Sequence, residues 1–246
     1  MTRITSVVAV DRRTAKRFRQ SLLSWARRRL RHFPWRAESD SYRVLLAEMM
    51  LRRTRVAQVV PVYVRFITRY PTVEDVASAS RADIATLLKP LGLAWRAENV
   101  ADMAREVAGR YGGRVPTDVD HLRTLPGVGE YVSNAVACFS RNQPLPIVDT
   151  NVLRVLGRVF GLCLTGEARR RRQFVQVAAT CLDRRAPRLY NYALLDLAAT
   201  ICKPRHPLCD VCPFARAALC RFHAVSDSTS ARIGRARTRT RQRRVV

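Results

Sequence analysis

Apolar residues recur every three or four positions along most of the chain, the spacing of helices that bury one face. Between residues 12 and 31, where Arg occupies the other faces, the apolar positions are Phe18, Leu22, Trp25 or Ala26, and Leu30. Pro34 is expected to end this first helix. No segment shows the sustained alternation of a strand. The pattern predicts an all-α protein.

Three further segments carry the start signal of a helix, because an apolar run follows a capping-box pattern. The Ser or Thr that stands three residues before an Asp is, in turn, Thr72, Ser80 and Thr117. Residues 44–66 are expected to form two helices interrupted near Pro61. Another helix is predicted at 151–160, where Gly161 marks its end.

The composition is that of a folded protein outside the membrane. Of the 246 residues, 48% are apolar. No apolar run approaches the roughly 20 residues of a membrane span, and the first residues lack a signal-peptide pattern. We therefore expect a soluble, intracellular protein of the cytoplasm and nucleoid, a monomer without a membrane partner.

The chain is strongly basic, with 45 Lys and Arg against 19 Asp and Glu and a formal charge of +26. Residues 232–246 hold seven Arg and no acid, which leaves +19 on the rest of the chain. A basic body favours a polyanionic partner, and nucleic acid fits best. Residues 223–246 contain little to bury, and they are predicted to form a basic disordered tail.

The stretch 125–129 reads Leu-Pro-Gly-Val-Gly between two helical patterns. Gly127 and Gly129 can adopt backbone angles closed to other residues, so a tight turn is predicted. A turn that opens a helix points free N–H groups outward, and these suit a phosphate oxygen. A lone carboxylate, Asp149, follows at the expected start of the next helix. A plain glycine turn with a capping Asp is the alternative, but the combination favours chemistry on a nucleic acid.

A cysteine cluster lies near the C-terminus, with gaps of six, two and seven residues between Cys202, Cys209, Cys212 and Cys220. Four thiolates within 19 residues predict a loop folded about a metal. Zinc accepts four thiolates as readily as an iron–sulfur cluster does, so the spacing leaves both open, together with a metal-free relic. The remaining cysteines lie in apolar segments and are expected in the core: Cys138, Cys163 and Cys181.

These features together resemble the helix-hairpin-helix (HhH-GPD) DNA glycosylases, a superfamily that includes endonuclease III and MutY-type adenine glycosylases. Its signature is a Leu-Pro-Gly-Val-Gly hairpin with an Asp just beyond the following helix, here 125–129 and Asp149. The resemblance covers about residues 30 to 222 and includes Pro34-Trp35-Arg36. Members hold a [4Fe–4S] cluster on Cys residues whose last gap is two residues shorter than here. A [4Fe–4S] cluster is therefore the expected cofactor.

The resemblance implies two helical lobes that flank a DNA-binding cleft. One is a six-helix barrel domain over residues 37–149, with the helix-hairpin-helix at about 117–140. The other joins residues 1–36 to 150–222 and forms the iron–sulfur cluster domain.

It also implies roles for individual residues. Asp149 would stabilise the positive charge that develops on the sugar as the base leaves, and help to orient water. Glu48 would act as an acid on the departing base, and a solvated or capping Glu is the alternative. Leu93 lies in the loop that enters the duplex beside the extruded base, although a helix-end packing residue fits it as well. The expected DNA contacts also include Gly127, Val128, Gly129, Arg52 and Arg53.

Base removal without strand cleavage is expected. Bifunctional members place a Lys two residues after the final Gly of the hairpin, and its amine attacks the sugar and cuts the strand. Here Tyr131 stands at that catalytic position, and residues 90–202 contain no Lys.

The expected substrate is a DNA duplex in which thymine or uracil lies opposite guanine. Leu51-Arg52-Arg53-Thr54 is similar to archaeal thymine/uracil mismatch glycosylases, whereas MutY-type enzymes have Leu-Gln-Gln-Thr there and Tyr at the position of Leu93. MutY-type enzymes also continue into a second domain, while this sequence ends about 25 residues after Cys220. The alternatives are an adenine glycosylase acting on A opposite G or 8-oxoguanine, and a catalytically silent DNA-binding module.

Overall fold

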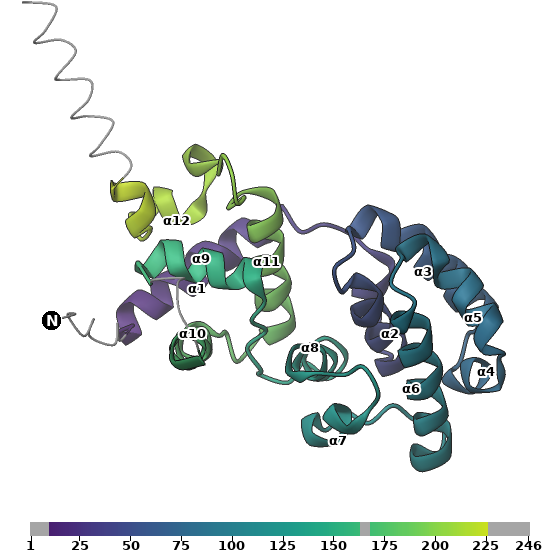
Figure 1. Cartoon of the computed structure of the whole chain (residues 1–246). Helices are drawn as coiled ribbons and strands as arrows, with labels where there is room; N and C mark the ends of the chain where they lie inside the picture. Colours follow the sequence, from purple (N-terminus) through teal and green to yellow (C-terminus); the bar gives the residue numbers. More distant parts are fainter. Residues whose placement is uncertain (1–9, 163–167, 226–246) are drawn as a thin grey trace, which may run out of the picture. The chain divides into compact units, whose positions relative to one another are not determined.

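The computed structural model describes residues 10–162 and 168–225, with the backbone alone for 168–171. These residues form helices and no strand, so the all-α prediction is confirmed. The helices, labelled in Figure 1, are α1 (Arg12–Ala26), η1 (Pro34–Arg36), α2 (Ser41–Leu51), α3 (Val56–Arg69), α4 (Val73–Ser78), α5 (Arg81–Leu88), η2 (Lys89–Leu91), α6 (Trp95–Tyr111), α7 (Val119–Thr124), α8 (Glu130–Arg141), α9 (Thr150–Phe160), α10 (Ala168–Cys181), α11 (Pro187–Thr200), η3 (Cys209–Val211) and α12 (Pro213–Arg216). None of these described helices is long and apolar enough to cross a bilayer.

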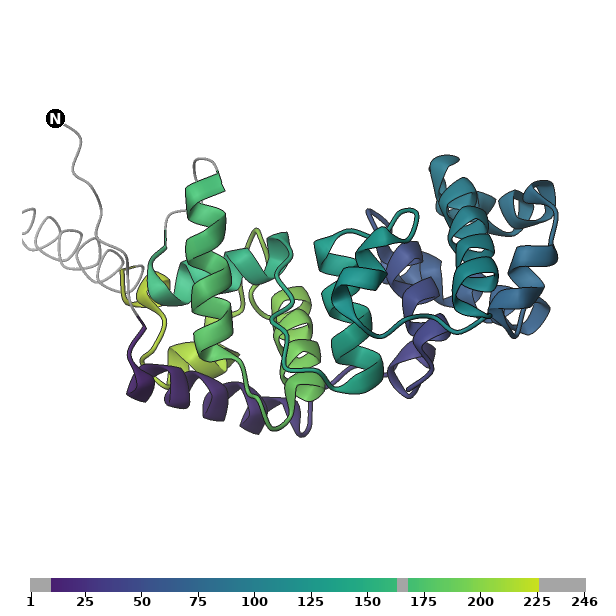
Figure 2. The same cartoon turned by 90° about the horizontal axis from the view of Figure 1, so that it is seen from below.

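The contacts divide the chain into two compact units. The sequence colours of Figure 1 and Figure 2 allow the residues of each unit to be traced. Unit 1 consists of Met1–Leu30, Val148–Asp183 and Leu189–Val246, and it holds α1, α9, α10, α12 and most of α11. Unit 2 consists of Arg31–Ile147 and Arg184–Arg188, and it holds α2 to α8. Asp149 and the four clustered cysteines thus belong to unit 1, and the hairpin belongs to unit 2.

Unit 1 is built around Phe18 of α1. Its ring stacks on Phe214 of α12 with centroids 4.2 Å apart, and it lies 5.3 Å from Phe160 of α9 and 6.5 Å from Tyr190 of α11. The predicted face of α1 is the buried one, with Ala15, Phe18, Leu22 and Ala26 inside. One amphipathic helix therefore supplies the surface on which the cysteine-bearing segment packs.

Unit 2 is organised around α2, which contacts α3, α6 and α8 and buries nearly all of its side chains. Outside this core, α6 packs against α4 and α5. Trp35 of η1 packs edge-on against Tyr63 of α3, with ring centroids 5.2 Å apart. Arg52, just after α2, and Asn99, in the second turn of α6, both approach Gly127, so these two helices lie next to the hairpin.

The interruption expected near Pro61 lies elsewhere. Pro61 is inside α3, and the chain instead breaks between α2 and α3, where Arg53 has a φ of +55°. Pro61 removes one hydrogen bond in the early part of α3. The helix persists because its inner face is anchored by Val59, Val62, Tyr63 and Phe66.

Two of the predicted helix caps are confirmed. Thr72 and Asp75 form a reciprocal capping box, and Ser80 accepts a hydrogen bond from the backbone N–H of Asp83. Cys138 and Cys181 are buried as predicted, whereas Cys163 lies outside the described residues. The predicted tail starts too early, because residues 221–225 are helical; the rest of it, 226–246, lies outside the described residues.

Candidate active site and cysteine pocket

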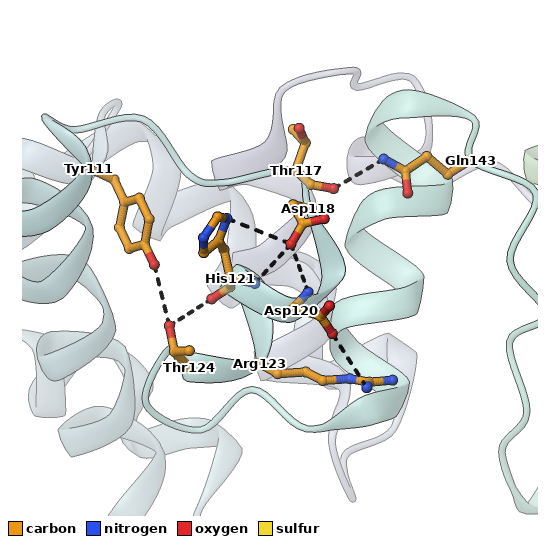
Figure 3. Close-up of polar contacts among 8 residues, drawn as sticks. All are labelled: Tyr111, Thr117, Asp118, Asp120, His121, Arg123, Thr124 and Gln143. Carbon is orange, nitrogen blue, oxygen red and sulfur yellow. Dashed lines mark hydrogen bonds and ion pairs between the residues drawn. The ribbon is translucent and has the colours of Figure 1, made fainter.

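The first helix of the hairpin, α7, begins at Val119 and is capped by Asp118 rather than by the predicted Thr117. The Oδ1 atom of Asp118 accepts hydrogen bonds from the backbone N–H groups of Asp120, at 3.0 Å, and His121, at 3.1 Å (Figure 3). The carbonyl of Thr117 instead accepts from Nε2 of Gln143, at 3.1 Å. The predicted cap is therefore wrong by one residue, because the Asp carboxylate satisfies two N–H groups at once.

The far end of α7 is closed by Thr124. Its hydroxyl donates to the carbonyl of His121 at 2.8 Å and lies 3.3 Å from the hydroxyl of Tyr111 on α6 (Figure 3). Both ends of this short helix are thus tied down, and the following turn starts from a fixed point.

The two glycines of the hairpin differ in what their backbone requires. Gly127 has a φ of +75°, and a Cβ atom there would lie 2.9 Å from Cβ of Asn99, which is too close. Gly129 has a φ of −100°, open to any residue, and a Cβ atom there would meet no protein atom within 4 Å. The prediction of special backbone angles is therefore wrong for Gly129. Its missing side chain instead leaves the start of α8 open, without a side-chain cap.

The basic pair lies beside this turn. Nη1 of Arg52 donates to the carbonyl of Gly127 at 2.8 Å, and its guanidinium lies 4.9 Å from the ring centroid of Trp95. Arg53 is exposed and in the left-handed region. Val128 is buried, at 7% exposure. The structure thus brings Arg52 to the hairpin through a direct hydrogen bond.

The remaining candidates of unit 2 lie on helices and on one loop. Glu48 is 4% exposed in the middle of α2, which rules out a solvated or capping side chain. Tyr131 is half-buried in the first turn of α8. Leu93 has a φ of +64° and is 39% exposed, so it does not serve as a packing residue at a helix end.

In unit 1, Asp149 caps α9 and both of its carboxylate oxygens are held. Oδ1 accepts from the backbone N–H of Val152 at 2.7 Å, and Oδ2 accepts from Nδ2 of Asn151 at 2.7 Å. One carboxylate thus has a backbone donor and a side-chain donor from the same first turn, which fixes its plane.

The four clustered cysteines line one pocket of unit 1. Its empty volume is about 330 Å³, part of it open to solvent, and Phe214 and Phe222 belong to the same wall. Cys202 follows α11, Cys209 begins η3, Cys212 caps α12 and Cys220 lies beyond α12. The long final gap is taken up by α12 and by Ala218, which has a φ of +51°.

Burial controls the protonation of three of these thiols. Desolvation is the main cause that raises the pKa of Cys209, Cys212 and Cys220, and the charges of neighbouring thiols raise it further. These raised pKa values favour the protonated thiols at neutral pH. A bound metal would have to displace the thiol protons, as metals do in thiolate sites generally.

The chain matches the model of a protein family, the HhH-GPD superfamily of base excision DNA repair proteins, over residues 46–177. It is 34% identical over 213 residues to a thymine-DNA glycosylase of Aeropyrum pernix, covering 83% of this chain and 94% of that protein. The chain belongs to the HhH-GPD superfamily. The solved structure of a thermostable thymine-DNA glycosylase superposes with a TM-score of 0.80 at 34% identity, over 86% of this chain and 97% of the other.

A second kind of relative within the superfamily is also similar to this HhH-GPD protein. An adenine DNA glycosylase of Mycobacterium tuberculosis is 38% identical over 195 residues, which cover 78% of this chain and 64% of that protein. Relatives of both kinds hydrolyse the N-glycosyl bond of a nucleotide. The chain is therefore a DNA glycosylase, and the predicted family and enzyme class are confirmed.

The sequence pattern missed two residues of α9 that connect the carboxylate of this glycosylase to the cysteine loop. Oδ1 of Asn151 accepts from Nη1 of Arg154 at 3.0 Å. Arg154 also donates from Nε to the carbonyl of Cys202 at 2.9 Å, and from Nη2 to that of Ala198 at 3.0 Å. Asp149, Asn151 and Arg154 are two and three residues apart, so they share the first turn and a half of the helix. The spacing of these residues is visible in the sequence, but the groups to which they bond are not.

A third missed residue is Arg158, one turn further along α9. It donates to Cys202 Sγ at 3.5 Å and to the carbonyls of Lys203 and Pro204 at 2.6 and 2.9 Å. Its guanidinium lies 4.8 Å from the ring centroid of Phe222, and its own carbonyl lies 3.6 Å from Cys220 Sγ. Arg158 thus supports two walls of the cysteine pocket.

Proposed function

We propose that this glycosylase removes thymine or uracil from pairs with guanine and leaves an intact abasic site. The observation that carries the catalytic part is Asp149, whose two carboxylate oxygens are held by two different donors. A preorganised carboxylate stabilises positive charge on the sugar without having to reorient during the reaction. The bond from C1′ to the base nitrogen breaks, the oxygen of a water molecule takes its place at C1′, and the base leaves with one proton of that water.

The target base must leave the stack before this bond is accessible. The uncapped start of α8 at Gly129 supports a contact between its N–H groups and a phosphate of the duplex. Arg52 and Arg53 add positive charge next to the hairpin. Leu93, exposed and apolar, is suited to fill the space that the base vacates.

Glu48 and Tyr131 of unit 2 are the other two residues that we assign to the reaction. Glu48 is buried, and we assign it the transfer of a proton to the departing base. Tyr131 has no amine, and residues 90–202 contain no Lys. Without an amine at this position no Schiff base forms with the sugar, so the strand is left uncut.

Two features support thymine or uracil as the target. The chain is 34% identical to the thymine-DNA glycosylase of Aeropyrum pernix over 94% of that protein, and it has Arg52-Arg53 and Leu93 at positions where the resemblance to MutY-type enzymes would lead one to expect Gln and Tyr. A mismatched pair is also easier to open than a matched one. The alternative, adenine excision, is favoured by the 38% identity to the adenine glycosylase of Mycobacterium tuberculosis.

We further infer that Cys202, Cys209, Cys212 and Cys220 hold a [4Fe–4S] cluster. All four line one pocket, although the last sequence gap is longer than in the resembling enzymes. Among the described residues, no three Cys, His, Asp or Glu side chains converge closely enough to share one metal ion. The support for a cluster is the donor set, because four Cys thiolates are the ligands of a [4Fe–4S] cluster and the enzymes that this chain resembles hold one on such a set. When bound, such a group adds folding free energy to the loop.

Metal analysis of anaerobically purified protein tests this cofactor. We expect about four irons per chain with matching sulfide, the content of one [4Fe–4S] cluster. Replacing Cys212 with Ser should lower that content, while Cys138→Ser, in the core of unit 2, serves as the control. Stoichiometric zinc in place of iron would refute the assignment.

The substrate is tested by single-turnover excision from matched duplexes at one salt concentration. The panel contains G·T, G·U, A·G, A·8-oxoguanine and oxidised pyrimidines. We expect thymine and uracil opposite guanine to be released fastest. Faster release of adenine would overturn the choice of substrate and support the MutY-type alternative. Tight binding alone decides nothing, because the basic surface binds any duplex.

A further inference from the structure

Arg96, the second residue of α6, has the largest of the fully buried side chains in the described part of the chain. It is 0% exposed, and no acidic side chain among the described residues pairs with it. Burial first, and the nearby charge of Arg52 second, lower the pKa of its guanidinium. A guanidinium nevertheless stays protonated in proteins. A buried cation without a counter-ion is costly, so its polar partners have to account for its presence.

Those partners are three backbone carbonyls and one hydroxyl, and they come from two segments, residues 52–54 and 91–92. Nη1 of Arg96 donates to the carbonyls of Leu91 and Gly92 at 3.0 and 2.9 Å. Nη2 donates to the carbonyl of Arg52 at 2.7 Å and to Oγ1 of Thr54 at 2.8 Å. The planar guanidinium has the donor geometry to bridge both loops, which a single ammonium lacks.

Both loops adopt backbone conformations that need external support. Gly92 and Leu93 have φ values of +65° and +64°, and Arg53 has a φ of +55°. The left-handed region strains a residue with a Cβ atom, and Leu has no local hydrogen bond to offset that strain. On the α5 side, Leu93 borders an open hollow of about 1090 Å³, part of it solvent. Side-chain packing from that side therefore does not hold the loop.

The same network reaches the hairpin. Arg52 presents its carbonyl to Arg96 and donates from its own side chain to the carbonyl of Gly127 at 2.8 Å. Both guanidinium groups lie near the ring of Trp95, that of Arg52 at 4.9 Å from its centroid and that of Arg96 at 5.8 Å. The chain of contacts therefore runs from the Leu93 loop through Arg96 and Arg52 to the phosphate-binding turn.

We propose that Arg96 is a positioning residue that holds Leu93 in the conformation that enters the duplex and couples this loop to the hairpin. The inference rests on the role of Leu93 given under Proposed function, but not on the identity of the excised base. Arg96 itself is buried away from solvent and touches no DNA. It acts by keeping an apolar side chain projected from a strained loop while the hairpin grips the backbone.

The test compares Arg96→Lys with Arg110→Lys, an exposed Arg of the same helix. Base extrusion is followed by the fluorescence of 2-aminopurine next to the target, in the duplex that the wild-type protein excises fastest. We expect Arg96→Lys to slow extrusion and excision by about tenfold to a hundredfold, as misplaced positioning groups do. Its duplex affinity and iron content should match those of Arg110→Lys, which behaves as wild type.

A double-mutant cycle with Leu93→Ala decides whether Arg96 acts through Leu93. We expect Leu93→Ala and Leu93→Ala/Arg96→Lys to extrude the base equally slowly, because the second change has nothing left to misplace. Losses that multiply would overturn the proposal, and so would normal extrusion by Arg96→Lys. If Arg96→Lys does not fold, Thr54→Val takes its place in the cycle with a smaller expected loss, because it removes one of the four acceptors of Arg96 and the hydrogen bond from the Thr54 hydroxyl to the carbonyl of Arg52.

The outcomes separate this inference from the proposed substrate. A protein that extrudes and excises adenine rather than thymine contradicts the substrate, while the cycle still tests Arg96. Normal extrusion by Leu93→Ala would contradict both the wedge role of Leu93 and the positioning role of Arg96.

Discussion

The Leu93 loop of unit 2 and the Asp149 turn of unit 1 are both held by arginines, but the object held is different. In unit 2, Arg96 grips backbone carbonyls next to residues with left-handed angles. In unit 1, Asp149 has the extended angles of an ordinary helix cap, and Arg154 reaches it through the side chain of Asn151. The wedge that we propose at Leu93 has to resist relaxation of its backbone, whereas the carboxylate that we propose to act at the sugar needs only a fixed orientation.

The comparison also shows why this chain depends on Arg for its internal structure. It contains 45 Lys and Arg, of which only Lys16, Lys89 and Lys203 are Lys. Arg52, Arg96, Arg154 and Arg158 each bond to backbone carbonyls of other segments, in addition to any role in the overall charge. Five N–H donors in one plane allow one side chain to join several carbonyls. Part of the basic composition is therefore structural and does not measure affinity for DNA.

The largest effect is expected from Asp149→Asn. The amide keeps an acceptor for the cap of α9 but removes the negative charge, so excision should fall by about 10²- to 10³-fold, or roughly 3–4 kcal/mol. Single-turnover rates and duplex affinity are measured together, with Asp120→Asn, an exposed carboxylate, as the control. A rate near that of the wild type would mean that another group stabilises the charge on the sugar.

The hairpin glycines should separate stability from DNA binding. Gly127→Ala places a Cβ atom at a φ of +75° and against Asn99, so it should lower the free energy of unfolding by about 1–3 kcal/mol. Gly129→Ala meets no protein atom, so stability should change by less than about 1 kcal/mol while duplex affinity falls. Thermal denaturation and binding at one salt concentration test both. Equal destabilisation by the two variants would contradict the distinction.

Replacement of Arg154 and of Arg158, both on α9, should have different effects on excision and on iron retention. Arg154→Gln releases Asn151 and the carbonyl of Cys202, so excision per iron-loaded protein should fall by about tenfold through misalignment of Asp149. Arg158→Gln loosens the cysteine loop but leaves Asn151 in place, so iron retention should fall while excision per iron-loaded protein stays near that of the wild type. The same loss of excision in both would show that Arg154 acts only through the loop.

No effect at all is expected from borohydride. The proposed site has Tyr131 where bifunctional relatives have a Lys, so reduction during turnover should trap no covalent adduct with DNA. The product strand should stay whole until alkali is added, which also serves as the positive control for abasic sites. A trapped adduct would place an amine at the sugar and reverse the assignment.

Much of the fold was readable from local sequence. The periodic face of α1, the caps at Thr72 and Ser80, and the all-α class follow from spacings within a few residues, which is the range over which helices are encoded. The hairpin motif, Asp149 and the cysteine gaps were equally visible as patterns, because their spacing is fixed along the chain.

Tertiary structure decided the rest. The positive φ of Gly127 and the packing of Asn99 against it make a side chain costly there while Gly129 stays open, and the anchored face of α3 moves the break from Pro61 to Arg53. The arginine contacts were out of reach of any local pattern, because Arg96 meets Arg52 across 44 residues and Arg154 meets Cys202 across 48. The sequence around a long side chain shows no periodic pattern that would identify the distant residue it contacts. The sequence determined which helices form and which chemical groups are present, and the folding of distant segments onto each other determined which arginines hold those groups in place.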